Sequence, residues 1–406
     1  MGKTTIDKII ARIMMVSFFL PMKWQPMVVI STSVYFVICS LYTSRSISRQ
    51  NLLWALFLGA GYLLYLGAIL FTPHEFARVA NKYLEYRLSY IVFPVIFALV
   101  SKDYLDTIFN ELRYFVYAAV VMCIATNAAF VYKYAVLPTG FHGVTHVAYR
   151  EGFEKICGLH PTYMTMYMVF SAGFLLVQGN AINKFLKYSL FYALLAFILP
   201  LLAKSPIIAM AVMLLHQLWL RRGSLLQYKW LFAGMLAVLV ASYLFVPFVS
   251  QRVQEMAGLS GGAMKGNVTD NSIYVRKLIW TVDTNMLRHY WLAGCGPGRL
   301  MYLLHVRYLF YSLQYGYDIS ALDPHNEYFY QWISFGLSGI LVLLSALFMH
   351  FCTAIKHSNF LYLYLMLILS ITFFTESVLA WQQGIIFYSF FSGLFFFMLR
   401  GKRNIA

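Results

Sequence analysis

Long apolar stretches recur along almost the whole chain, and they limit its fold more than any other feature of the sequence. Inside lipid every backbone N–H and C=O group must be hydrogen-bonded within the protein, so only helices and closed barrels span a membrane. The runs lack the two-residue alternation of barrel strands. The sequence therefore predicts an all-α integral membrane protein with about twelve spans, near residues 9–21, 26–42, 52–71, 89–101, 114–133, 162–178, 188–203, 206–220, 230–249, 326–352, 360–377 and 383–399.

Composition agrees with this class of protein. The 406 residues are 61% hydrophobic and only 11% charged, whereas soluble domains are about half apolar and about a quarter charged. Lys3, Lys8 and Arg12 precede the first apolar run, and no small-residue cleavage site follows it. We therefore expect a retained first span rather than a cleaved signal peptide.

The net charge of +16 would suggest a nucleic-acid partner in a soluble protein. Here a topological explanation is better, because Lys and Arg gather in alternate connections, as the positive-inside rule requires. The alternation predicts a single polytopic domain over residues 1–406 with both termini in the cytoplasm. The cytoplasmic connections and tail carry Arg45, Arg49, Lys102, Arg113, Lys184, Lys187, Arg221, Arg222, Lys229, Lys356, Arg400, Lys402 and Arg403.

Two outer connections are predicted to be partly helical. Residues 72–88 favour an amphipathic helix at the interface, with Phe76, Val79, Tyr83 and Tyr86 on one face. Residues 250–325 form a long periplasmic loop between the ninth and tenth spans. It opens with a glycine tract (Gly258, Gly261, Gly262, Gly266), continues with a helix from Ser272, breaks at Gly294–Gly298 and ends with an amphipathic helix over 300–315. The first of these helices has the apolar face Val275, Leu278, Ile279, Val282 and Met286.

The tetrapeptide Asp323-Pro324-His325-Asn326 directly precedes the tenth span. Asp323 is a favourable N-cap and Pro324 suits the first helical position, which places His325 in the first turn. The positive end of a helix dipole disfavours imidazolium and attracts anions such as phosphate. We expect a neutral histidine base beside an anion site at a membrane surface.

Two cations are candidates for that anion site. Arg276 lies beside the apolar face of the helix from Ser272, with Trp280 and Asp283 at i+4 and i+7. A guanidinium binds phosphate oxygens bidentately, although an arginine snorkelling to the interface is the alternative. Lys204 lies between two spans on the outer side and offers a point charge. A boundary lysine at a helical turn is the alternative there.

Other outer residues are weaker candidates for substrate contacts. His160 and Tyr163 open the sixth span and follow Arg150, although such residues are also ordinary at an interface. Glu376, ahead of Gln383, either faces a cavity, pairs with Arg276 or Lys204, or is an exposed turn residue. His142 and His146 have metal-ligand spacing without a supporting ligand, so we expect no metal. Pairing of Cys157 with Cys295 stays open.

These residues together resemble the O-antigen ligase superfamily. His325-Asn326, nine residues and then Gly336-Leu337-Ser338-Gly339 match its His-Asn-x9-Gly-x-x-Gly signature. Upstream, Arg276-x3-Trp280 and Gly294-Cys295-Gly296-Pro297-Gly298 resemble the Arg…Trp…Gly-x-Gly-x-Gly stretch of the family. The Glu376-Ser377…Gln383-Gly384 segment is similar to a pattern in some branches. Many members carry Ser-Arg or Thr-Arg at an outer turn where this chain has Lys204-Ser205. Compared with arginine, a lysine keeps the positive charge but loses bidentate geometry.

The resemblance implies a membrane glycosyltransferase of GT-C-like architecture in the bacterial inner membrane, acting at the periplasmic face. It implies an inverting, metal-independent transfer without a cofactor, from an undecaprenyl-diphosphate-linked glycan to lipid A–core or a similar acceptor. His325 would be the base, with Arg276 and Lys204 at the diphosphate. Asn326 would hold the local geometry or contact sugar. The other candidates for substrate contacts are Trp280, Arg150, His160, Tyr163, Glu376 and Gln383.

Rival functions remain open from sequence alone. A polymerase of the same fold differs only in its acceptor. A lipid or polysaccharide transporter would need charges or broken helices near the membrane midplane, and charges are scarce there. A purely structural membrane protein would not need a His-Asn pair at a capped helix start.

Overall fold

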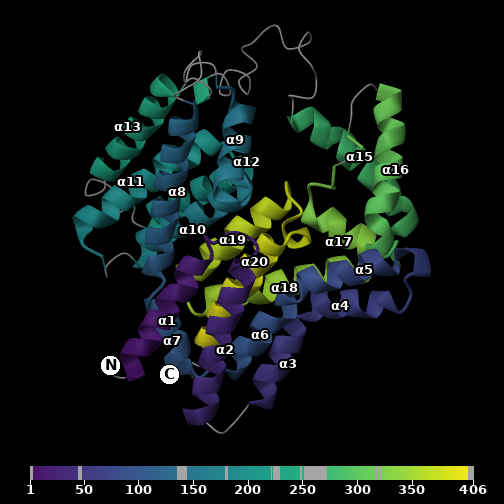
Figure 1. Cartoon of the computed structure of the whole chain (residues 1–406), viewed down its shortest axis with the longest axis horizontal. Coiled ribbons are helices and arrows are strands. Elements are labelled where there is room, and N and C mark those ends of the chain that lie inside the picture. Colours follow the sequence, from purple (N-terminus) through teal and green to yellow (C-terminus); the bar gives the residue numbers. More distant parts are fainter. Residues whose placement is uncertain are drawn as a thin grey trace. The chain divides into compact units, whose positions relative to one another are not determined.

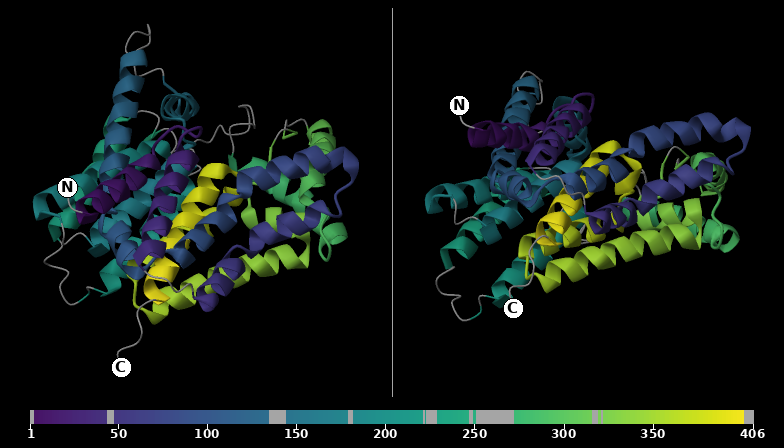
Figure 2. Two further views of the ribbon diagram at one scale, coloured as in Figure 1. Left: turned by 60° about the horizontal axis from the view of Figure 1, so that its bottom comes forward. Right: turned by 90° about the horizontal axis from the view of Figure 1, so that it is seen from below.

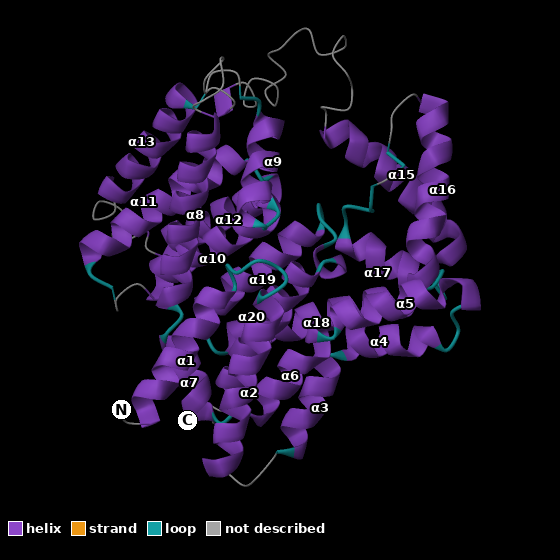
Figure 3. Cartoon of the chain, in the orientation of Figure 1, coloured by secondary structure: helices purple, strands orange, loops and turns teal. Residues whose placement is uncertain are grey.

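The fold is helical throughout the part of the chain that the structure describes. The structure is a computed structural model, and it describes residues 3–43, 48–134, 144–178, 182–220, 222, 229–246, 249–250, 272–315, 319–320 and 322–400. Helices joined by short connections account for nearly all of these residues, and no strand occurs among them (Figure 3). The prediction of an all-α chain is confirmed. The glycine tract 258–266, His142 and Arg45 lie outside the described residues.

The chain divides into two compact units, each built from segments that are far apart in sequence. The first unit contains residues 1–36, 106–263 and 359–371, and the second contains 37–105, 264–358 and 372–406. Three helices run across these boundaries: α2 (Gln25–Thr43), α7 (Lys102–Asn110) and α19 (Phe360–Phe373). Figure 1 labels the helices that follow.

Helix α10 organises the first unit. It packs against α8, α11 and α12, and it is buried from Pro161 to Leu176. Because its buried residues are almost all apolar or aromatic, the helix can be covered on every side. The helices of this unit are α1 (Lys3–Ser17), α8 (Arg113–Tyr134), α9 (His146–Cys157), α10 (Pro161–Gln178), α11 (Lys184–Leu201), α12 (Lys204–Leu220) and α13 (Lys229–Phe245).

Helix α20 has the same role in the second unit. It is buried from Gln383 to Leu399 and packs against α6. Its yellow ribbon can be followed in both views of Figure 2. The elements of this unit are α3 (Arg49–Leu58), α4 (Ala60–Ile69), α5 (His74–Arg87), α6 (Ser89–Leu99), α15 (Ser272–Tyr290), α16 (Pro297–Tyr315), α17 (Glu327–Phe335), α18 (Leu337–Lys356), the 3-10 turn η5 (Val378–Ala380) and α20 (Gln382–Arg400).

Several helices are long and apolar enough to cross a membrane. Among the described residues, five segments meet that test, and the bent pair α3–α4 makes a sixth if the two helices form one span. Three shorter apolar helices are Lys204–Leu220, Ala233–Phe245 and Phe360–Phe373. These helices identify a multi-pass membrane protein. The count of twelve spans stays a prediction. The five segments are Gln25–Thr43, Lys102–Lys133, Lys184–Leu201, Leu337–Lys356 and Gln382–Arg400.

Two of the predicted spans are broken rather than continuous. The span predicted over 52–71 bends by 64° between α3 and α4. The span predicted over 326–352 breaks at Gly336, whose φ of 63° and ψ of −147° lie outside helical space. The broken backbone has a new partner there, because the amide of Leu337 donates to the carbonyl of Leu292 at 3.0 Å. The expectation of one uninterrupted helix was wrong, since a glycine pair at helical spacing does not reveal a break.

The predicted helix at residues 72–88 is present as α5, but its buried face differs from the expected one. Val79 and Tyr86 are exposed, whereas Ala80 and the entire Arg87 side chain are buried. Arg87 is covered by aromatic rings, with its guanidinium 4.4 Å from the Tyr65 ring centroid and 4.9 Å from that of Tyr83. Burial of Arg87 was not predicted, because the charge of an arginine normally requires water.

Candidate active site

A packed core of three helices supports the candidate site. The apolar face predicted for the helix from Ser272 is confirmed: Ile279, Val282 and Met286 are fully buried in α15. They pack with residues of α16 and α17, including Leu300, Leu304, Tyr308 and Ile333. On the same side of α15, the Tyr308 hydroxyl donates to Oδ1 of the buried Asp283 at 2.7 Å. Arg276 is therefore carried by a helix that is fixed by packing.

The glycine segment before α16 fixes the connection between these helices. Its amides pair with carbonyls at the end of α17: Cys295 N donates to Ile333 O at 2.8 Å, and Gly296 N donates to Ser334 O at 2.9 Å. Gly294 has φ of 73°, and a Cβ there would lie 2.4 Å from Ser334 O. The glycine-rich motif therefore has a structural reason, since a side chain would separate the two backbones.

His325 lies in a turn before α17, not in its first helical turn. The helix begins at Glu327, and its N-cap is Asn326, whose side-chain oxygen accepts from Phe329 N at 3.1 Å. Asp323 instead accepts from the amide of His325 at 2.9 Å and stabilises a turn in which His325 has φ of 44°. The predicted N-cap at Asp323 was wrong by three residues, because a short polar side chain can close a turn as well as cap a helix.

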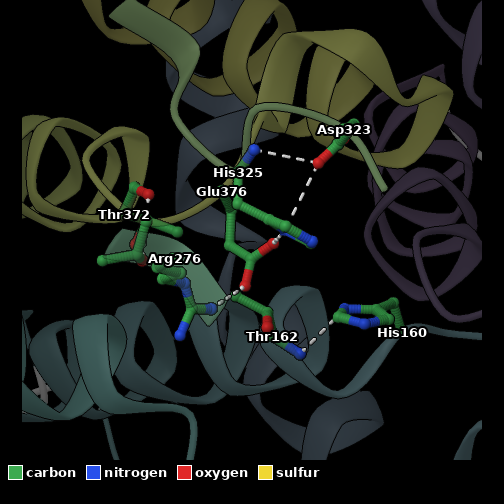
Figure 4. A network of polar contacts seen from close by, with 8 residues as sticks. His160, Thr162, Arg276, Asp323, His325, Thr372 and Glu376 are labelled. Carbon is green, nitrogen blue, oxygen red and sulfur yellow. Dashed lines mark hydrogen bonds and ion pairs between the residues drawn. The ribbon is translucent and has the colours of Figure 1, made fainter. Parts of the chain in front are cut away.

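A chain of three polar side chains forms the centre of the site (Figure 4). Nδ1 of His325 lies 3.2 Å from Oε2 of Glu376, and Oε1 of Glu376 lies 3.2 Å from Nη2 of Arg276. Oδ1 of Asp323 lies 3.3 Å from the same Nδ1. Side-chain exposures of 29% for His325, 24% for Arg276 and 16% for Glu376 leave the cluster partly open. It therefore joins a base, a carboxylate and a cation.

The environment raises the pKa of His325 above its ordinary value of 6.5. Burial alone would lower this pKa, but the hydrogen bond to Glu376 and the charges of Asp323 and Glu376 outweigh burial and the opposing charge of Arg276. The expectation that a helix dipole holds the ring neutral was wrong in direction, because carboxylate oxygens of Glu376 and Asp323 lie 3.2 Å and 3.3 Å from Nδ1 of the ring. Carboxylates accept hydrogen bonds, so we assign the proton of the neutral ring to Nδ1, and Nε2 keeps its lone pair.

The other residues predicted in this unit have varied positions. Trp280 is half-buried and packs edge-on against Phe329, with ring centroids 6.4 Å apart. Asn326 and Gln383 are buried, and the Asn326 oxygen caps α17. Contacts of all three with substrate stay predictions. Glu376 is neither an exposed turn residue nor a partner of solvent alone, since it pairs with Arg276 and His325.

The first unit carries the other four predicted residues. Lys204 is half-buried at the first turn of α12, directly after the turn that ends α11. Nδ1 of His160 accepts from the amide of Thr162 at 3.3 Å, and its ring packs against the buried Tyr163. Arg150 is half-buried on α9. Their roles at a substrate stay predictions.

Cysteines and metal ligands add no further chemistry to the site. All five cysteines are free thiols, so Cys157 and Cys295 are not paired. Within the described part of the chain, no group of three or more His, Cys, Asp or Glu side chains is arranged to hold a metal ion.

Sequence reasoning missed several residues close to the site. Asp323 was assigned to a cap and not to the His325 ring, and Asp283, Glu327 and Arg87 were given no site role. All of the last three are buried ionisable groups. The one available signal was their type, since a charged residue within an amphipathic or apolar segment is costly unless it is paired.

The fold is that of a multi-pass membrane protein, with several helices long and apolar enough to cross a membrane. Its second unit carries a partly exposed cluster of a histidine, a carboxylate and an arginine. A family model described as O-Antigen ligase matches residues 189–344. The match confirms the resemblance to the O-antigen ligase superfamily over these residues. No curated protein matches the chain.

The matched stretch includes most but not all of the cluster. It contains Lys204, Arg276, His325 and both glycines of the signature, whereas Glu376 lies beyond it. The structure therefore adds a carboxylate to the motif residues that the match contains.

Proposed function

We propose that the protein transfers a glycan from an undecaprenyl-diphosphate carrier to a sugar hydroxyl of lipid A–core or a similar surface acceptor. The observation that carries this proposal is the His325–Glu376–Arg276 chain, of which His325 and Arg276 lie in the stretch that matches the O-antigen ligase model. The reaction takes place at the periplasmic face of the bacterial inner membrane. It inverts the configuration at the anomeric carbon and uses no metal ion.

In the proposed step, Nε2 of His325 accepts the proton of the acceptor hydroxyl as its oxygen attacks the anomeric carbon of the donor. The bond between that carbon and the diphosphate oxygen breaks, and undecaprenyl diphosphate leaves with the electron pair. Glu376 stabilises the imidazolium that forms, because it binds the opposite ring nitrogen. The charge on the leaving diphosphate increases during the step, and preorganised cations lower the barrier by stabilising it.

Arg276 is the main candidate for that cation. Its contact with Glu376 uses Nη2, and a guanidinium has five N–H donors, so others remain for phosphate oxygens. Lys204 is proposed as the second cation of the site. Asn326, Trp280, Gln383, Arg150, His160 and Tyr163 are proposed to contact the glycans or the carrier.

Deleting the gene tests the proposal, with surface glycans analysed by electrophoresis. A ligase deletion leaves lipid A–core without polymer while long chains accumulate on the carrier. A polymerase deletion leaves a single repeat on the acceptor, and that result would favour the second candidate function, a polymerase of the same fold. An unchanged glycan profile would contradict both. The test uses strains that assemble carrier-linked glycan. In the deletion strain, a plasmid copy of the wild-type gene must restore the glycan profile, and a copy with His325→Ala must not.

A further inference from the structure

Glu327 is a buried carboxylate that the proposed reaction does not use. It is the first residue of α17 and has no exposed surface. Oε2 accepts from the backbone amide of Leu379 at 2.7 Å, and Oε1 accepts from Nε2 of Gln331 at 2.7 Å. Both oxygens are therefore engaged by neutral donors, and the bond to Leu379 crosses from α17 to η5.

This bond joins the two chain segments that carry the base and its carboxylate. Glu327 follows His325 by two residues, and Leu379 follows Glu376 by three. The contact between Nδ1 of His325 and Oε2 of Glu376 is 3.2 Å, near the long end for a hydrogen bond. A small separation of α17 from η5 is therefore enough to break it.

We propose that Glu327 is a positioning residue that sets the His325–Glu376 contact by holding the amide of Leu379. The inference deepens the proposed function, on which its catalytic consequence rests. The contact itself can be measured without any transfer reaction, so the two can fail separately.

Charge compensation for Arg87 is the competing explanation. The Arg87 side chain is fully buried, donates to the Tyr330 hydroxyl at 3.0 Å, and its charge acts on Glu327. Asp323 is the other charged group that acts on Glu327. The tyrosines that interact electrostatically with Glu327 are Tyr65, Tyr90 and Tyr330. If Glu327 compensates the charge of Arg87, its own negative charge matters and the length of its side chain does not.

Two substitutions separate reach from charge. Glu327→Gln keeps an oxygen at the same distance for Leu379 N and loses the charge, while the amide of Gln331 can turn to accept from the new side chain. Glu327→Asp keeps the charge but is one methylene shorter, about 1.5 Å, and no longer reaches the amide. Positioning predicts that Gln is tolerated and that Asp is harmful. Charge compensation predicts the reverse.

The first experiment titrates His325 itself. Diethyl pyrocarbonate reacts with neutral imidazole, so its rate of addition to His325 against pH, followed by mass spectrometry on the detergent-purified protein, reports the pKa of this ring. In Glu327→Asp we expect the pKa to fall by roughly one unit, because the bond to Glu376 no longer offsets burial. Glu327→Gln is expected to titrate like wild type. The groups that act on the ring are Asp323, Glu376, Arg276 and Asp283.

The second experiment measures glycan transfer from an undecaprenyl-diphosphate-linked glycan. Glu327→Asp should lose on the order of ten- to a hundredfold in rate, as expected for misplaced reacting groups, with Glu327→Gln within about threefold of wild type. In a Glu376→Gln background the Glu327→Asp substitution should have little further effect, because its target contact is already changed. Glu85→Gln, at an exposed position of α5, is the matched control.

Each outcome decides the inference. A wild-type His325 titration in Glu327→Asp overturns it, and so does a Glu327→Gln protein as impaired as Glu327→Asp. Additive losses in the double variant also overturn it. If His325→Ala retains full transfer activity, the proposed function fails. The His325 titration in the Glu327 variants would still test the positioning role of Glu327.

Discussion

One oxygen of the Glu376 carboxylate contacts the His325 ring, and the other contacts the Arg276 guanidinium, each at 3.2 Å. The proposed base and the proposed diphosphate-binding cation are therefore coupled through one side chain. A change at Glu376 is expected to alter both the basicity of the histidine and the orientation of the arginine.

Replacing His325 removes the proposed base. We expect His325→Ala to lower transfer by about 100- to 10 000-fold, the range for general-base catalysis. Carrier-linked glycan and acceptor in detergent or liposomes provide the assay. His305→Ala is the control, because His305 is exposed on α16. Normal activity of well-folded His325→Ala would remove the base from the mechanism.

The planar fork of Arg276 is expected to matter beyond its charge. Arg276→Lys should lose more activity than Arg288→Lys, an exposed charge-conserving change on the same helix α15. A lysine cannot bind one carboxylate and phosphate oxygens with a fixed fork. Arg276→Ala should be worse still. Initial rates at varied donor concentration give the comparison, and equal turnover of Arg276→Lys and wild type would contradict bidentate recognition.

The pH profile tests the origin of the His325 basicity. The base acts when neutral, so activity rises with pH through its pKa, which the carboxylates hold above 6.5. In Glu376→Gln the carboxylate charge is gone while burial, which lowers this pKa, remains. The acidic limb should therefore move to lower pH, although the maximal rate falls. A limb that stays in place would show that another group titrates.

The helix break at Gly336 can be tested by stability. Gly336→Ala combines a backbone at φ of 63° with a Cβ that would lie 2.1 Å from Leu292 O. The unfavourable backbone conformation alone costs roughly 1–3 kcal/mol. Gly67→Ala is the control, since a Cβ at Gly67 in α4 meets nothing within 4 Å. In detergent, the midpoint temperature of thermal unfolding should fall for Gly336→Ala and not for Gly67→Ala. Equal midpoints for Gly336→Ala and wild type would contradict a structural need for glycine.

Lys204 has the least structural support among the proposed cations. If it binds the diphosphate, Lys204→Arg should keep substantial activity and Lys204→Gln should lose it, because a neutral amide cannot offset the leaving charge. Lys184→Gln, exposed at the start of α11, controls for loss of positive charge. Transfer at matched expression is the measurement. Full activity of Lys204→Gln would leave Arg276 as the main cation.

Local patterns predicted the elements of this fold better than their ends and breaks. Apolar periodicity identified the α15 face of Ile279, Val282 and Met286, because burial follows helical spacing. The break at Gly336 was missed since its cause is a long-range bond, from Leu337 N to Leu292 O. Sequence spacing does not contain such a partner.

The site shows the same division. Arg276 and His325 were predicted from residue type and motif, and a pairing of Glu376 with Arg276 was one of several alternatives. Its contact with Arg276 joins positions 100 residues apart in the chain, and its contact with His325 joins positions 51 residues apart. The raised pKa of His325 depends on the same contact, so a prediction based on the nearby helix end had the wrong sign.

The interleaved order of the second unit has a consequence for biogenesis. Arg276 and His325 leave the ribosome before Glu376, and the segment that carries Glu376 belongs to the same unit as both. A nascent chain that has inserted as far as α18 therefore holds an arginine and a histidine without the carboxylate that couples them. On the proposed mechanism the protein should therefore be inactive in transfer until the segment with Glu376 has been inserted, and a product truncated before Glu376 should bind lipid-linked sugar without transferring it.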